Sequence, residues 1–207
     1  MISYIWDLDG TLLDSYGIII SAAREAAETA GCPDQEEEIL RTVKRGSLTA
    51  YLADVSRRSG VAAAELMERY RAFSHARDDR IPLMDGAEEA LRALRETGAV
   101  HYVYTHRGDS SEPILKRLGI LGFFREVVTA VYGFPPKPSG AGVRYLTEKY
   151  GLSPEDTWYV GDRPIDMLCA RDAGVRGMLL LPEDACVAPT GCEDRVIRSL
   201  RELERIS

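Results

Sequence analysis

The feature that most constrains this chain is a regular alternation of short apolar segments with helical segments from Ile81 onward. The apolar segments have the length and composition of buried strands, whereas the segments between them have helical periodicity and end at glycines. We expect strands at Val100–Thr105, Val127–Val131, Thr157–Val160 and Met178–Leu181. Because strands and helices alternate in this way, the sequence predicts an α/β fold: a parallel, doubly wound sheet with helices on both faces.

Helices are expected between these strands and after the last of them. The first has apolar residues at helical spacing from Ala87 to Leu94, and the second begins at Ser110 or Ser111. The others are expected at Ala141–Tyr150, Pro164–Ala173 and Glu193–Arg205.

A second, purely helical region interrupts the pattern near the N-terminus. A strand is expected at Ser3–Asp7, but no strand-like segment follows until after Asp79. Helices are expected at Tyr16–Ala30, Gln35–Lys44, Leu48–Arg58 and Ala62–Arg77. The sequence therefore predicts two domains: an α/β core of residues 1–14 and 82–207, and an inserted helical domain of residues 15–81.

Charge and composition exclude several classes of function. The net charge of −7 argues against nucleic acid or an anionic membrane as the main partner, because both bind basic surfaces. No apolar run approaches the roughly 18 residues of a membrane span, and no basic segment precedes the first apolar stretch as in a signal peptide. The four cysteines are scattered without a CxxC pair. We expect a cytoplasmic protein with reduced thiols and no zinc site.

Polar residues follow the predicted strands at the ends where ligands bind in open α/β sheets. Asp7 and Asp9 end the first strand, and Thr105 ends the strand near residue 100. Lys137 follows the next strand, and Asp162 follows the strand near residue 158. Carboxylates, a hydroxyl and a lysine at one edge fit a metal ion and a phosphate together.

These residue types can carry out phosphoryl transfer. A carboxylate such as Asp7 can attack phosphorus only if charge repulsion is screened, which a bound Mg²⁺ does. Mg²⁺ prefers oxygen ligands, and the side chains of Asp7 and Asp162 with the carbonyl of Asp9 supply them. Asp9 is the candidate acid and base for the leaving oxygen and for water. Thr105 and Lys137 can bind the phosphoryl group.

With these motifs in order, the chain resembles the haloacid dehalogenase superfamily, in the branch with a helical cap inserted after the first motif. The resemblance rests on Asp7-Leu8-Asp9-Gly10-Thr11-Leu12, on Thr105, on Lys137, and on Gly161-Asp162 with Asp166. It implies a Rossmann-like core with a four-helix cap. It also implies that Asp7 is the nucleophile and that Asp7, Asp9 and Asp162 hold Mg²⁺.

Within the superfamily, the residues favour a phosphatase of the phosphoglycolate phosphatase-like group. Asp9 argues against dehalogenases and phosphonate-cleaving relatives, which lack an acid at this position. Sugar-phosphate mutases carry a cap histidine where this chain has Ile18-Ile19-Ile20. The expected substrate is a small phosphorylated metabolite, and the expected assembly is a monomer or homodimer. A sugar-phosphate mutase and a non-catalytic binding protein on this scaffold are the alternatives.

Some candidate residues have two interpretations. Asp166 can hold Lys137 or a metal-bound water, or it can serve only as an acid in the first turn of a helix. His106 can offer its backbone N–H to the phosphate or touch the substrate directly. In the cap, Lys44, Arg45 and Gly46 can read the leaving group or form a solvated helix end.

Overall fold

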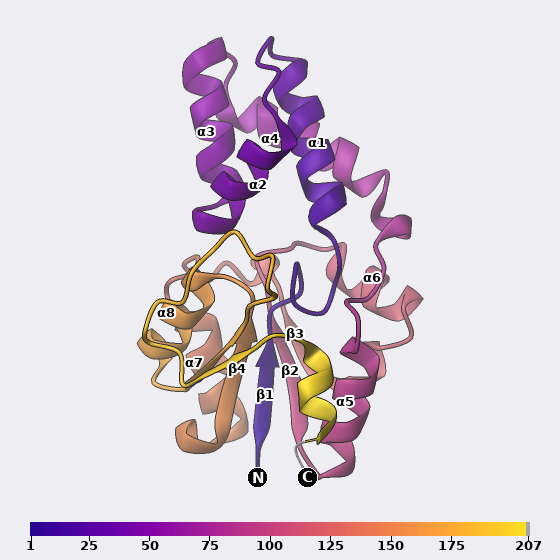
Figure 1. The fold of residues 1–207 in the computed structure, drawn as a ribbon, viewed down its shortest axis with the longest axis vertical. Coiled ribbons are helices and arrows are strands. Elements are labelled where there is room, and N and C mark those ends of the chain that lie inside the picture. Colours follow the sequence, from indigo (N-terminus) through magenta and orange to yellow (C-terminus); the bar gives the residue numbers. More distant parts are fainter. Residues whose placement is uncertain (206–207) are drawn as a thin grey trace. The chain divides into compact units, whose positions relative to one another are not determined.

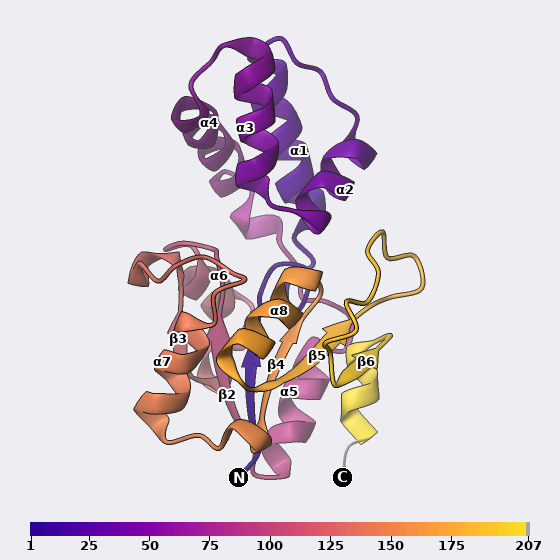
Figure 2. The same ribbon diagram turned by 90° about the vertical axis from the view of Figure 1, so that its left-hand side faces the viewer.

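The structure is a computed structural model that describes residues 1–205 of the chain (Figures 1 and 2). It contains two compact units. One combines Met1–Asp14 with the chain from Pro82 onward, and the other is Ser15–Ile81. The first is called the α/β unit below, and the second the helical unit.

The α/β unit is built on a six-stranded sheet in which every neighbouring pair of strands is parallel. The strand order is β3-β2-β1-β4-β5-β6. The strands are β1 (Ser3–Trp6), β2 (Val100–Tyr104), β3 (Phe124–Val128), β4 (Thr157–Gly161), β5 (Arg176–Leu180) and β6 (Arg195–Ile197). The predicted parallel, doubly wound sheet is therefore confirmed.

Helices cover both faces of this sheet. The α-helices are α5 (Ala87–Glu96), α6 (Ser111–Arg117), α7 (Ala141–Tyr150) and α8 (Pro164–Ala173). The 3₁₀ helices are η2 (Leu121–Phe123), η3 (Ala130–Tyr132), η4 (Pro154–Asp156) and η5 (Leu200–Arg205). Helices α7 and α8 lie on one face, and α5 with η5 lies on the other (Figure 1).

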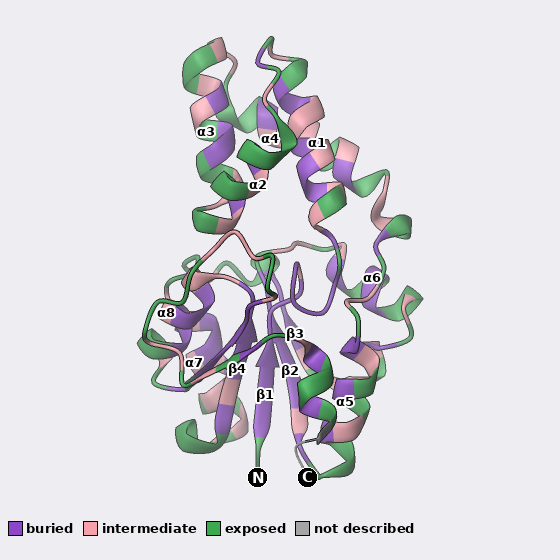
Figure 3. Cartoon of the chain, viewed as in Figure 1, coloured by how far each residue is buried: buried purple, intermediate pink, exposed green. Residues whose placement is uncertain are grey.

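The core of the α/β unit lies on both sides of the central strands. All four residues of β1 are buried, as a strand covered by helices on both faces requires (Figure 3). Burying each large apolar side chain such as Ile5 contributes about 1.5–3 kcal/mol. Helix α7 packs closely against β2 because Gly142 of this helix has no side chain: a Cβ there would lie 2.3 Å from the ring of Tyr104 in β2.

The helical unit has a separate core. Its helices are α1 (Tyr16–Glu28), α2 (Glu36–Arg45), α3 (Leu48–Ser59) and α4 (Ala63–His75), followed by the 3₁₀ helix η1 (Asp78–Arg80). Their buried apolar residues include Ile20, Ile39, Val55 and Leu66, which belong to one cluster. The four expected helices are all present, and their ends differ from the expected ones by no more than two residues.

None of the helices in the described part of the chain combines the length and the apolar character needed to cross a membrane.

One sequence-based expectation was wrong in part near the middle of the chain. The strand expected at Val127–Val131 is Phe124–Val128, and the residues from Ala130 form η3 instead. The side chain of Thr129 explains the change, because it accepts a hydrogen bond from the N–H of Val131 at 3.3 Å and starts the helical turn.

The helix expected at Glu193–Arg205 was also wrong. Arg195–Ile197 forms β6 beside β5, and only Leu200–Arg205 is helical, as the 3₁₀ helix η5. The strand expected at Met178–Leu181 begins earlier, at Arg176. A strand at these residues forms hydrogen bonds with the N–H and C=O groups along the edge of β5, whereas a helix would leave those groups of β5 without strand partners. Tertiary context therefore outweighs local propensity at these residues.

Candidate active site

The candidate residues of the α/β unit converge at the carboxyl ends of β2, β1 and β4. Trp6 of β1 is level with Val103 of β2 and Val160 of β4, so these three strands end side by side. Asp7 follows β1 directly, and its N–H donates to the carbonyl of Val160 at 2.9 Å. The strand order changes direction between β1 and β4, and ligands bind at such switch points in doubly wound sheets.

A tight loop after β1 presents Asp9. The N–H of Gly10 donates to the carbonyl of Leu13 at 2.8 Å, and the N–H of Leu13 donates to the carbonyl of Leu8 at 2.8 Å. Gly10 has φ of 79°, in the left-handed region where a side chain is strained. The loop therefore folds back on itself within a few residues and keeps Asp9 close to Asp7.

Lys137 is the central cation of the site. It is 3% exposed, and its Nζ lies 2.8 Å from Oδ1 of Asp7 and 2.8 Å from Oδ1 of Asp166. The rings of Tyr104 and Tyr159 flank the ammonium, with centroids at 5.4 and 5.2 Å. A buried charge with two carboxylate partners and aromatic walls is held in one position.

The buried charges shift one another's proton affinities. Burial raises the pKa of Asp7 to about 7, and the ammonium of Lys137 works against this shift. Burial acts in the same direction on Asp166, but Lys137 and Arg163 outweigh it and lower its pKa. Burial alone would lower the pKa of Lys137, but the carboxylates of Asp166 and Asp7 together raise it. Lys137 thus stays charged and favours ionised carboxylates beside it.

Asp166 contacts both Lys137 and the first turn of α8. Its Oδ1 accepts from Lys137, and its Oδ2 accepts from the backbone N–H of Arg163 at 3.0 Å, at the start of α8. Space for its side chain depends on Gly161, where a Cβ would lie 2.4 Å from the Cβ of Asp166. The first turn of α8 therefore fixes Asp166 against Lys137.

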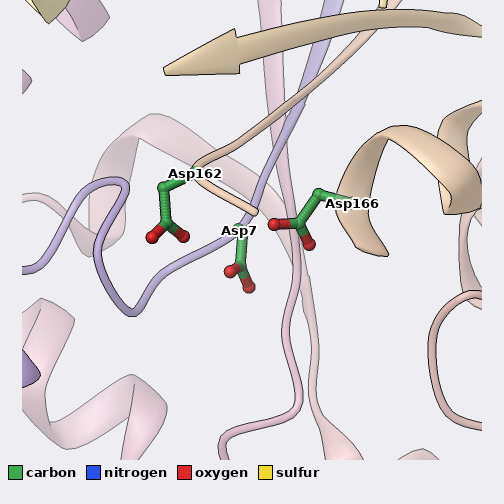
Figure 4. A group of neighbouring side chains, drawn as sticks. All are labelled: Asp7, Asp162 and Asp166. Atoms are coloured by element: carbon green, nitrogen blue, oxygen red, sulfur yellow. The ribbon is translucent and has the colours of Figure 1, made fainter. Parts of the chain in front are cut away.

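Three buried carboxylates form a cluster that fits a metal ion. Asp7, Asp162 and Asp166 each offer an oxygen atom within 4.8 Å of the others, and Figure 4 shows the three side chains converging. Among the described residues, Oδ2 of Asp7 is buried without a hydrogen-bond partner. Both oxygens of Asp166 are already engaged, so Asp7 and Asp162 fit the ion better. Hard carboxylate oxygens suit Mg²⁺.

Asp9 has a partner that the sequence analysis did not single out. Nε of Arg107 lies 3.1 and 3.2 Å from the two carboxylate oxygens of Asp9, and Nη2 lies 2.7 Å from Oδ1. The Arg107 side chain is 7% exposed and that of Asp9 is 23% exposed. The sequence feature that could have identified this partner is the position of Arg107, because it places a cation two residues after Thr105 at the end of a strand.

Thr105 and His106 occupy the loop after β2. The hydroxyl oxygen of Thr105 accepts from the N–H of Arg107 at 3.1 Å, which leaves its O–H to donate elsewhere. Nε2 of His106 accepts from the backbone N–H of Lys137 at 2.8 Å, so the ring is neutral and protonated on Nδ1. Burial, with smaller effects of Lys137 and Arg163, lowers the pKa of His106 to about 4. Phosphate binding by His106 stays a prediction.

The candidate cap residues lie in the helical unit. Lys44 and Arg45 end α2, and Gly46 follows them. Nζ of Lys44 lies 4.4 Å from the centroid of the Tyr16 ring. Their expected role in reading the substrate stays a prediction.

Comparisons with known proteins agree with this geometry. Residues 4–180 match the family model for haloacid dehalogenase-like hydrolases. The chain therefore belongs to this family of hydrolases.

Two relatives and one solved structure illustrate the likeness. The chain is 30% identical to the pyrophosphatase PpaX of Bacillus velezensis, over 83% of this chain and 79% of that protein. It is 29% identical to a phosphoglycolate phosphatase of Vibrio cholerae, over 82% and 79%. A predicted phosphoglycolate phosphatase from Haemophilus somnus shares the fold, with a TM-score of 0.82, 22% identity and coverage of 100% and 97%. The expected place of the chain among the phosphatases of the family is thus confirmed.

Proposed function

We propose that this protein is a Mg²⁺-dependent phosphatase that hydrolyses a small organic phosphate monoester through an aspartyl-phosphate on Asp7. The observation that carries the proposal is the buried carboxylate of Asp7, held by Lys137 and adjacent to Asp162 where β1 and β4 end. Relatives named phosphoglycolate phosphatase and pyrophosphatase support a small phosphorylated substrate.

The proposed reaction has two steps with Asp7 as the nucleophile. In the first, a carboxylate oxygen of Asp7 attacks phosphorus, the bond from phosphorus to the ester oxygen breaks, and Asp9 gives that oxygen its proton. In the second, water attacks the phosphorus of the aspartyl-phosphate while Asp9 takes a proton from it. The bond to Asp7 then breaks, inorganic phosphate leaves, and both side chains return to their starting states.

The remaining residues bind the phosphoryl group and balance its charge. Lys137 contributes a fixed positive charge beside Asp7, and Thr105 has its O–H available for a phosphoryl oxygen. Asp7 and Asp162, with the carbonyl of Asp9, would hold Mg²⁺. When bound, the ion supplies positive charge that reduces the repulsion between the carboxylate and the phosphoryl oxygens. Asp166 keeps Lys137 in position.

We further propose that the helical unit is a cap that selects the leaving group. Its two connections to the α/β unit, at Asp14–Ser15 and Ile81–Pro82, are single chain crossings, which suit a movable lid. The cations Lys44 and Arg45 would then meet an anionic group of the substrate, such as a carboxylate. Reversing these charges with Lys44→Glu and Arg45→Glu should raise KM for phosphate esters whose leaving group carries a carboxylate. It should not raise KM for p-nitrophenyl phosphate, whose leaving group has no such charge.

A screen of phosphate monoesters with and without Mg²⁺ tests the function. Purified protein should release inorganic phosphate from at least one metabolite only with Mg²⁺, and Asp7→Asn should abolish release. Full activity in Asp7→Asn would contradict the role of the nucleophile. Conversion of a sugar 1-phosphate to its 6-phosphate faster than phosphate release would instead establish a mutase. Failure to bind beryllofluoride with Mg²⁺ would favour a non-catalytic binding protein.

A further inference from the structure

The contact between Arg107 and Asp9 has no role in the reaction as described above. We propose that Arg107 is a positioning residue, which holds the carboxylate of Asp9 in the orientation needed for proton transfer. The proposal rests on the proposed function, because it concerns the efficiency of the acid and base of that reaction.

The geometry of the pair restricts Asp9 in both position and plane. Nε and Nη2 of Arg107 both approach Oδ1, at 3.1 and 2.7 Å, while Nε also lies 3.2 Å from Oδ2. A planar guanidinium that presents one edge to a carboxylate fixes its direction, which a lysine could not do. Because the arginine side chain is almost fully buried, water screens this pair less than an exposed one.

Arg107 is itself tied to the rest of the site. Its N–H donates to the hydroxyl of Thr105 at 3.1 Å, and its carbonyl accepts from the N–H of Ala130 at 3.0 Å. Its Nη1 reaches Oγ of Ser110 at 3.3 Å. One residue therefore connects the proposed proton donor to the hydroxyl proposed to bind the phosphoryl group. This connection keeps Asp9 and Thr105 in a constant relative arrangement.

The position of Asp9 needs such a support. It lies on the loop after β1 with a side chain that is 23% exposed, so solvent reaches its carboxylate, and a rigid buried partner restricts the rotamers that the side chain adopts. Proton transfer to the leaving oxygen requires hydrogen-bond distance and alignment, and a misplacement of about 1 Å can cost on the order of 100-fold in rate. Loss of Arg107 should therefore weaken acid catalysis rather than substrate binding.

The test compares esters that differ in their need for a proton donor. An alkyl phosphate releases a basic alkoxide, whereas 2,4-dinitrophenyl phosphate releases a stable anion that needs no proton. Single-turnover rates with Mg²⁺ and excess enzyme isolate the first step. We expect Arg107→Met to slow the alkyl ester on the order of 100-fold, and the dinitrophenyl ester less than about threefold.

Two further variants strengthen the comparison. Arg107→Lys keeps the positive charge without the planar edge, so it should fold even if Arg107→Met does not. Its single-turnover rate should fall less than that of Arg107→Met, and again more for the alkyl ester than for the dinitrophenyl ester. Arg92→Met removes an arginine from an exposed pair with Glu88 on α5 and should match the wild type on both esters. Thermal unfolding of every variant confirms that the rates come from folded protein.

A double variant decides whether Arg107 acts through Asp9. Asp9→Asn should, like Arg107→Met, slow the alkyl ester far more than the dinitrophenyl ester. Adding Arg107→Met to Asp9→Asn should slow the alkyl ester by less than about a further threefold, because the positioned carboxylate is already gone. Equal losses on both esters, or losses that multiply in the double variant, would overturn the inference and indicate a direct substrate contact. A wild type that turns over neither ester would overturn the proposed function itself, and that result needs no variant.

Discussion

The Nζ atom of Lys137 lies at equal distances of 2.8 Å from carboxylate oxygens of Asp7 and Asp166. The ammonium thus bridges the proposed nucleophile, which follows β1, and an acid in the first turn of α8. Each partner is buried, so each depends on the others for compensation of its charge. The site is in this sense a single electrostatic unit, and changes to one member should affect the rest.

Removing the charge of Lys137 should harm both stability and activity. We expect Lys137→Met to lower the free energy of unfolding by about 3–5 kcal/mol, because two buried carboxylates lose their cation. Activity should fall by on the order of 100-fold or more, since the phosphoryl charge loses its partner. Urea denaturation and kcat/KM measure the two effects. Lys149→Met, in a partly exposed pair with Glu126, is the control, and equal effects of both variants would contradict the assignment.

A methyl group at Gly161 should disturb Asp166. A Cβ there would lie 2.4 Å from the Cβ of Asp166, so Gly161→Ala must displace this side chain and its contact with Lys137. We expect a loss of about 1–3 kcal/mol in unfolding free energy, together with a lower kcat. Gly122→Ala adds the same methyl group where no atom lies within 4 Å, and should be nearly neutral. A Gly161→Ala enzyme with wild-type kcat would show that Asp166 need not stay in place.

Mg²⁺ should stabilise the folded protein through Asp162. At a concentration ten times the Kd, a ligand that binds only the native state adds about 1.4 kcal/mol, which raises Tm by a few degrees. Differential scanning fluorimetry with and without MgCl₂ measures this shift, and Asp162→Asn should abolish it. Asp156→Asn changes a half-exposed acid in η4 and should keep the shift. A shift that survives in Asp162→Asn would place the ion elsewhere.

The buried His101 should make stability depend on pH. Nδ1 of His101 accepts from Nε1 of Trp6 at 3.1 Å, and burial lowers the pKa of this histidine to about 4. The unfolded chain therefore binds a proton at higher pH than the folded protein, and stability falls as pH decreases from about 6.5 to 4. His101 should contribute a loss of about 3 kcal/mol between pH 7 and pH 4.

The measurement for His101 is a difference between two proteins. Burial raises the pKa of Asp7 to about 7, so the titration of Asp7 changes stability in the opposite direction over much of the same range. Chemical denaturation of the wild type and of His101→Gln at each pH removes this contribution, because both proteins contain Asp7. A stability difference that stays constant from pH 7 to pH 4 would mean that His101 is protonated normally in the folded state.

The sequence predicted most of the architecture because its signals are local. Strand ends marked by Asp7, Thr105 and Asp162 lie at one edge of the sheet, since parallel strands place their carboxyl ends together. The final helix was predicted wrongly because the residues at Arg195–Ile197 pair with β5. That outcome depends on an open sheet edge, which no local pattern reveals.

The sequence by itself determined the family of this protein, the order of its first five strands with the α-helices between them, and the candidate residues at the strand ends. Those features follow from periodicity, turn residues and short motifs, which a linear chain displays directly. Only the tertiary structure decided the ion pair of Arg107 with Asp9 and the hydrogen bond from the backbone N–H of Lys137 to the ring of His106. Such pairings depend on side-chain direction and on distances of about 3 Å between residues far apart in the chain, which folding alone establishes.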